Sequence, residues 1–364
     1  MSKKTKQTAP ISRANATTPA PRRRYLLWVF GLLALACAAY YFWGVNGETQ
    51  GPSLSDDSGS EPTLTAKKPR LQLLSPKETG VDFQNKILED NEHNVVLNIN
   101  QYNGGGVAVA DINNDNLPDI YFVCSNGKNL LYLNQGNFKF KDITDAAGVG
   151  SEEGFETSVT AADVNADGWL DLFVCHAGPD ASGRVAKLFI NNGSLPNGEG
   201  WGGAFTESAN AYGLDDKSPC SGANFFDADN DGDLDCYVIN HPTDLSHANR
   251  LVLKYGPDGK SFLPDLDPKA EYDSDNFYLN QNGKFVNVSK QAGIQNFGFG
   301  LSVSVSDVNA DGWPDVYVGN DFVHPDNLFI NNQKGGFTDQ MSKYFRHNSM
   351  SAMGAELCDF DNDG

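Results

Sequence analysis

The chain has 364 residues, enough for one large domain or two ordinary ones. Its formal charge of −20 is unevenly spread: residues 1–45 hold seven Lys and Arg and no acid, and the rest holds 20 basic and 47 acidic residues, a net −27. A surface this acidic repels nucleic acid and attracts cations, so no nucleic-acid partner is expected, and cation binding is favoured over acids that serve solubility alone.

The N-terminal segment is predicted to be a membrane anchor. Residues 1–24 are polar and basic, and would form a cytoplasmic tail. Residues 25–45 are a run of 21 uncharged residues, long enough to cross the ~30 Å hydrocarbon core as a helix. Because the basic residues precede this run, the positive-inside rule places the rest of the chain outside the cytoplasm, in the periplasm or at the cell surface. An uncleaved signal anchor is the favoured interpretation.

Two alternatives for this segment stay open. Ala34-Leu35-Ala36 resembles a signal-peptidase site, which would make the protein secreted. Together with Cys37 it loosely resembles a lipobox, which would make the protein a lipoprotein, and the arginines before Tyr25 weakly resemble a twin-arginine signal. Residues 46–68 are rich in Gly, Ser, Asp, Glu, Thr and Pro, and are predicted to be a disordered linker.

From about residue 69 the chain repeats one acidic motif. Asp227–Asp235 has carboxylates at positions one, three, five and nine, and a glycine at position six. Asp163–Asp171 and Asp307–Asp315 are further copies, and Asp111–Asp119 is a looser one with Asn in place of the glycine. A fifth copy begins at Asp359, where the sequence ends before its ninth position.

This motif indicates calcium. Ca²⁺ takes six to eight oxygen ligands, and an acid on every second residue of a short loop supplies most of them, while the glycine permits a left-handed turn. Ca²⁺ is favoured over an ion-free Asx-type turn, and over Mg²⁺, which demands a tight octahedron. Without the ion the carboxylates would repel each other, so the metal is predicted to be structural. The predicted ligands, besides the position-seven carbonyl, are Asp111, Asn113, Asp115 and Asp119; Asp163, Asn165, Asp167 and Asp171; Asp227, Asp229, Asp231 and Asp235; and Asp307, Asn309, Asp311 and Asp315.

Each acidic loop lies between two apolar or alternating runs, which indicates a β-hairpin. An EF-hand is excluded, because it needs flanking helices and a Glu at position twelve. Two more apolar runs follow each hairpin, and in the first three copies a small-residue link comes next. The predicted fold is all-β: a β-propeller of four-stranded blades over residues 69–364, about four blades and the start of a fifth, behind the N-terminal transmembrane helix. In the first copy the four strands are 106–110, 120–124, 130–134 and 138–143.

Two inserts interrupt the repeat and are the first places to look for a partner site, because long loops on a rigid scaffold usually carry binding. One lies around Asn192–Gly203 and the other from about His241 to Asp275. The first insert contains Gly198–Gly203, which matches GxGxxG but has no strand before it and no helix after it, so it is interpreted as a plain loop.

These residues resemble FG-GAP/VCBS-type repeats, the calcium-loop blades also found in integrin α-subunit heads. A closer similarity, over residues 70–364, is to the cartilage acidic protein-like family, often followed by an ASPIC/UnbV domain. The family implies a calcium-loaded, seven-bladed propeller outside the cytoplasm. With about four blades present, the chain is expected to be a fragment of a longer protein. The two exposed edges of such a partial propeller would pair with another chain or aggregate. The similarity rests on Tyr102–Ala108, Asn240–Pro242, Gly319–Phe322, Phe345–Ser349 and Met353-Gly354.

The predicted function is adhesion, or recognition of an unknown extracellular protein or glycan, by a membrane-tethered protein that is not an enzyme. A purely structural spacer or scaffold is one alternative. The other is the propeller part of a secreted glycan- or lipid-processing enzyme, with catalytic groups in the inserts or in a missing C-terminal region. The acids to check for that enzyme are Asp244, Asp265, Asp273 and Asp321.

Other notable side chains are predicted to be structural. Cys124 and Cys175 lie in apolar runs and are interpreted as buried free thiols, while a Cys220–Cys236 bridge stays open. Trp169 and Trp313 are interpreted as packing groups in preference to sugar-stacking ones. Four histidines are interpreted as hydrogen-bonded loop residues in preference to a transition-metal site, because no two have ligand spacing: His176, His241, His247 and His324.

Overall fold

The computed structural model describes residues 71–364, with gaps at 152–153, 179–182, 194–204, 243–252, 256–261, 265–273, 323, 350 and 360–364. The chain divides into two units, Met1–Gln72 and Leu73–Gly364, and the account below concerns the second. Within the described ranges, no helix has the length and apolar character needed to cross a membrane. The predicted anchor and linker lie outside those ranges.

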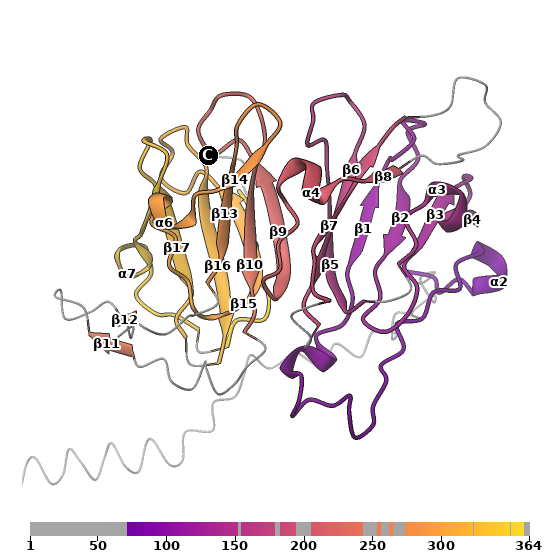
Figure 1. Cartoon of the computed structure of the whole chain (residues 1–364), viewed down its shortest axis with the longest axis horizontal. Helices are drawn as coiled ribbons and strands as arrows, with labels where there is room; N and C mark the ends of the chain where they lie inside the picture. The colour runs from indigo at the N-terminus through magenta and orange to yellow at the C-terminus, as the bar shows by residue number, and fades with distance from the viewer. Residues whose placement is uncertain are drawn as a thin grey trace, which may run out of the picture. The chain divides into compact units, whose positions relative to one another are not determined.

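The second unit is built from four antiparallel sheets of four strands each, in chain order (Figure 1). The first sheet contains β1 (Val107–Ala110), β2 (Asp119–Phe122), β3 (Leu130–Asn134) and β4 (Phe140–Asp142). The second contains β5 (Glu156–Ala162), β6 (Asp171–His176), β7 (Lys187–Asn191) and β8 (Phe205–Glu207). The third contains β9 (Cys220–Phe226), β10 (Asp235–Asn240), β13 (Asn276–Asn280) and β14 (Phe285–Asn287), and the fourth contains β15 (Phe299–Ser306), β16 (Asp315–Asp321), β17 (Asn327–Asn331) and β18 (Phe337–Asp339).

Within each sheet the strands follow the chain as a meander, so the predicted all-β repeat of four strands is confirmed. The second strands, such as β6 and β10, are buried along nearly their whole length. They read as continuous apolar runs because neighbouring sheets cover both of their faces. The fourth strands have only three residues each, and most of their side chains are exposed.

Successive sheets pack face to face through apolar clusters. One cluster joins the first two sheets through residues such as Leu131 and Val174, and a second joins the second and third sheets through Leu188 and Val238. A third cluster, which includes Phe277, joins the third and fourth sheets. Each sheet therefore depends on the next one to bury its apolar face, as expected of a repeat architecture.

The first strands of consecutive sheets lie side by side. Thr160 Oγ1 on β5 donates to the carbonyl of Ala223 on β9 at 2.8 Å. Ser221 Oγ on β9 donates to the carbonyl of Gly300 on β15 at 2.6 Å. Between β1 and β5 the approach is so close that a Cβ on Gly106 would lie 2.6 Å from the Cα of Ser158. The four sheets are thus arranged like consecutive blades around their first strands.

The small-residue links contain one-turn helices, which the sequence did not predict. They are α3 (Thr144–Ala147), α4 (Ala209–Tyr212) and α6 (Ser289–Ala292), and α7 (Met341–Tyr344) takes the same place after β18. The first three end on a glycine in the left-handed region, for example Gly148 at φ 72°. This glycine lets the chain reverse sharply from the outer strand toward the first strand of the next sheet.

Two more elements precede β1, namely α2 (Pro76–Thr79) and the 3₁₀-helix η1 (Ile99–Tyr102). The long insert of the third sheet contains a two-stranded hairpin, β11 (Leu253–Tyr255) and β12 (Phe262–Pro264). This insert follows the C-terminal end of β10, whereas the acidic loop precedes its N-terminal end. The acidic loops and the insert therefore lie at opposite ends of the strands.

The cysteines differ from expectation. Cys175 on β6 forms a disulfide with Cys220 on β9, with their Cα atoms 5.1 Å apart, so the interpretation of Cys175 as a free thiol was wrong. Cys236 is buried and free, which also rules out the Cys220–Cys236 bridge. Cys124 is buried and free, as predicted. The bridge joins two neighbouring sheets, which spacing along the chain does not reveal.

Candidate metal centre

All four complete acidic loops connect the first and second strands of a sheet, as predicted. Each loop has two residues with positive φ. Position six is one of them, with Gly168 at φ 87° and Asn116, the looser case, at φ 66°. Position four is the other, with Ala166 at φ 57° and Ala310 at φ 56°. Left-handed alanine is costly, so a strong local network must hold these turns.

That network uses the predicted ligands at positions one and five. In the second loop, Asp163 Oδ1 accepts from the amide of Asp167 at 3.0 Å, and Asp163 Oδ2 accepts from Gly168 at 2.8 Å. Asp167 Oδ1 accepts from the amide of Trp169 at 2.9 Å. Equivalent bonds occur in the other three loops. These carboxylates therefore curl the loop with their side chains gathered on one side.

The aspartate at position nine closes the hairpin. Asp235 is fully buried, and its Oδ2 accepts from the amide of Ala228 at 3.0 Å. Its Oδ1 accepts from the amide of Asn280 at 2.8 Å, which ties the loop to the third strand. Asp119, Asp171 and Asp315 make the same pair of bonds. Position nine is therefore an anchor of the fold as well as a predicted ligand.

Burial raises the pKa of these anchoring carboxyls. It raises the pKa of Asp235 to about 7, and the pKa of Asp119 and Asp171 to about 6. The pKa of Asp315 rises too. The neighbouring loop carboxylates add to each shift, because they disfavour a further negative charge. An ion-free loop thus carries an electrostatic cost that a bound cation would remove.

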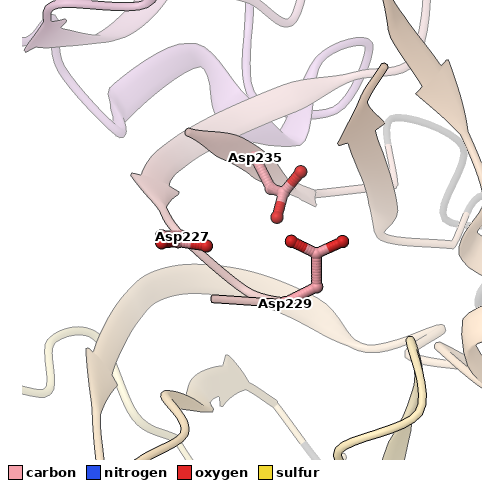
Figure 2. Close-up of side chains that lie close together, drawn as sticks. All are labelled: Asp227, Asp229 and Asp235. Carbon is pink, nitrogen blue, oxygen red and sulfur yellow. The ribbon is translucent and has the colours of Figure 1, made fainter. Parts of the chain in front are cut away.

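The third loop brings its acids closest together (Figure 2). Asp227, Asp229 and Asp235 each offer an oxygen, and these oxygens lie within 4.8 Å of one another. Asp229 Oδ1 is buried and has no hydrogen-bond partner. Burial and the nearby Asp231 raise the pKa of Asp229. A carboxylate oxygen left without a donor among other carboxylates fits a hard cation.

The residue at position three plays a different role in loops one and two than in loops three and four. Asn113 and Asn165 use Nδ2 to donate to the position-five aspartate at 2.9 Å, so in loops one and two the amide acts as an internal tie. In loop four, Asn309 Oδ1 is buried without a partner, like Asp229 Oδ1 in loop three. Among the described residues, only loop three gathers three acidic or histidine groups closely enough to hold a metal.

The spacing of positions one, three, five and nine did not reveal two features of the loops. Asp233, at position seven of loop three, adds a fifth carboxylate, and burial and Asp231 raise its pKa. Asn114 and Asn230, at position four, each donate to the carbonyl of a position-six glycine in the next sheet, Gly168 at 3.1 Å and Gly312 at 3.2 Å. The Asn at position four of loops one and three is the sequence feature that could have indicated these bonds between sheets.

The remaining candidates do not form a site. His241 and His324 both pack against the ring of Phe299. Within the described part of the chain, no group of three potential metal ligands includes them or His176; His247 lies outside it. Of the four acids considered for catalysis only Asp321 is described, and it accepts hydrogen bonds from Ser351 Oγ and from the amide of Phe322.

Trp169 packs against Gly193, where a Cβ would lie 3.0 Å from the indole ring. The GxGxxG segment lies outside the described residues.

Comparison with known proteins agrees with the repeats. Residues 111–174 and 307–364 match the family described as FG-GAP-like repeat. Cartilage acidic protein 1 of Xenopus tropicalis is 34% identical over 101 residues, which are 28% of this chain and 16% of the relative. The proteins of the same name from Mus musculus and Homo sapiens are 27% identical over 180 residues, 49% of this chain and 26% of each relative. The matches thus span about a quarter or less of these relatives' length.

Proposed function

Because this chain carries FG-GAP-like repeats and is related to cartilage acidic protein 1, we propose that it is a calcium-binding, extracytoplasmic β-propeller protein that recognises a protein or glycan. The acidic loops bind Ca²⁺ as a structural ion, and residues 25–45 tether the protein to the membrane. The observation that carries the calcium assignment is the acidic cluster of loop three, with its unpartnered oxygen on Asp229.

Several features support the extracytoplasmic, ring-forming part of this proposal. The Cys175–Cys220 disulfide favours an oxidising compartment outside the cytoplasm. The side-by-side first strands and the shared apolar clusters are the packing expected between propeller blades. The long insert of the third sheet lies at the ends of the strands opposite the acidic loops, where a partner would bind.

The test of calcium binding is a melting experiment. The purified chain is freed of metal with EDTA, and its melting temperature is measured with EDTA, with Ca²⁺ and with Mg²⁺. Ca²⁺ should raise the melting temperature by several degrees and Mg²⁺ by less, because only the folded loops gather the oxygens and Ca²⁺ tolerates their geometry. Equal melting temperatures in EDTA and in Ca²⁺ would refute the calcium assignment.

The membrane tether is tested separately. Fractionation of cells that express the full chain should place it with the membranes, and protease added from outside should remove residues beyond 45. A chain found in the cytosol, or fully protected from external protease, would contradict the proposed location. Loss of residues 1–45 by cleavage would instead assign the secreted alternative.

A further inference from the structure

A pocket of about 360 Å³ lies where the segment before β1 meets the strand ends of the first and second sheets that are away from the acidic loops. Its position follows from β6, which begins at the ninth residue of an acidic loop and ends at His176, a residue of the pocket wall. The volume lies within the roughly 300–1,000 Å³ typical of small-ligand sites. Asn98, Asn126 and Phe155 also line it.

Three side chains offer hydrogen-bond donors to this pocket. Asn98 is only 2% exposed and its Nδ2 has no partner; its Oδ1 already accepts from the amide of Asn100 at 3.1 Å. Asn126 Nδ2 is also buried without a partner. His176 Nδ1 accepts from the amide of Val185 at 3.3 Å, which leaves the proton on Nε2. Burial lowers the pKa of His176, so the ring is neutral and donates through Nε2 alone.

A buried carboxylate lies behind the wall. Glu156 is 1% exposed, and its Oε2 has no hydrogen-bond partner. A Cβ on Gly154 of the pocket wall would lie 2.7 Å from this oxygen, so a side chain there would collide with the carboxylate, which does not itself line the pocket. Leaving the amide donors of Asn98 and Asn126 unpaired costs free energy, which a ligand of matching polarity would recover.

The buried carboxylate behind the wall is already compensated, and Glu92, the acid that lines the pocket, is exposed. Lys187 Nζ lies 3.3 Å from Glu156 Oε1 and 2.5 Å from Ser151 Oγ. Because this ammonium compensates the Glu156 carboxylate, the buried wall favours a neutral ligand. That ligand must accept hydrogen bonds from two amides and an imidazole, and the lining carboxylate of Glu92 is available to accept one from it. Adjacent hydroxyl groups do both, and the Phe155 side chain offers an apolar surface beside them.

We propose that this pocket binds a neutral sugar residue, held by Asn98, Asn126 and His176. This proposal rests on the recognition function proposed above. It adds the class of ligand that is recognised and the place in the fold where that ligand binds. It does not rest on calcium, since the pocket lies at the other end of the strands from the acidic loops.

The experiment is saturation-transfer NMR on the purified full chain with the methyl glycosides of glucose, galactose, mannose and N-acetylglucosamine. At least one of them should receive saturation and titrate to a single site. Two variants should weaken that affinity at least tenfold. Asn126→Asp turns a donor into an acceptor, and Gly178→Ala places a methyl group 3.1 Å from His176 Nε2. The matched control is Asn282→Asp, in an exposed turn of the third sheet, which should leave the affinity within twofold.

No transfer to any of the four sugars would overturn the proposal, and so would equal affinity in the pocket variants and the control. Binding of charged analogues alone, such as glucosamine or glucuronate, would overturn it as well. Melting curves in EDTA and Ca²⁺ on the same samples separate the two proposals. A calcium-stabilised chain without sugar binding keeps the calcium assignment, and sugar binding without calcium stabilisation keeps the pocket.

Discussion

At the scale of single residues, the loops differ at position three more than their shared motif indicates. In loops one and two an Asn donates to the neighbouring aspartate and satisfies part of the network internally. In loops three and four the corresponding oxygens of Asp229 and Asn309 are buried without a partner. An unpaired buried acceptor destabilises the ion-free protein, so these two loops gain most from a cation.

Asp229→Asn should reduce the effect of calcium. The variant removes one negative ligand of loop three and part of the repulsion around Asp231. Its melting temperature in EDTA should therefore equal or exceed that of the wild type, while the gain on adding Ca²⁺ should shrink. Scanning calorimetry in both conditions measures this. Asp145→Asn, at an exposed ion pair with Lys128, is the control and should change neither value by more than a degree or so. An undiminished calcium gain in the Asp229 variant would count against loop three as the site.

Asp275 makes stability depend on pH. It is buried, accepts from Tyr237 Oη at 2.9 Å and from the amide of Asn240 at 2.9 Å, and burial raises its pKa to about 7. Between about pH 4 and pH 7 the folded protein keeps a proton that the unfolded chain has lost. The free energy of unfolding therefore falls as the pH rises through this window. Denaturant titrations across the window should show that slope, and Asp275→Asn should make it shallower without abolishing it, because Asp119, Asp171 and Asp235 also have raised pKa values. A slope unchanged in this variant would assign it to other groups.

At the scale of elements, hairpins were predictable and the contacts between sheets were not. Alternation and acidic spacing located β1 to β3 and their repeats, because strand pairing across a short loop is a local property. The one-turn helices were missed, since four residues such as Ala209–Tyr212 give no helical period. Ala166 and Ala310 at positive φ were missed as well, because their conformation is imposed by the surrounding carboxylates and not by their own preference.

The disulfide between β6 and β9 should contribute strongly to stability. It spans 45 residues, for which chain entropy gives about 4 kcal/mol. Cys220→Ala should lower the free energy of unfolding by an amount of this order, measured by denaturant titration. Cys358→Ser, at an exposed free cysteine, is the control and should have little effect. Alkylation of the unfolded, unreduced chain should modify Cys124, Cys236 and Cys358 but not Cys175 or Cys220. Modification of either of the last two would disprove the pairing.

At the scale of the whole unit, the two kinds of site lie at opposite ends of the same strands. The repeats and their order were predicted from the acidic loops. The pocket was not, because Asn98, Asn126 and His176 come from three separate segments that meet only when the first two sheets pack together. Residues of this kind carry no motif, and only the packed structure brings them to one place.

The amide-to-carbonyl bonds at position four have a consequence for how the proposed calcium ions would bind. Asn114 links loop one to loop two, and Asn230 links loop three to loop four, whereas loop two has Ala166 at that position and offers no side-chain donor to loop three. Occupancy of one loop in a linked pair should stiffen its neighbour before the second ion arrives. Calorimetric titration should then resolve two cooperative pairs in place of four independent events, and Asn230→Ala should uncouple one pair and leave the other intact.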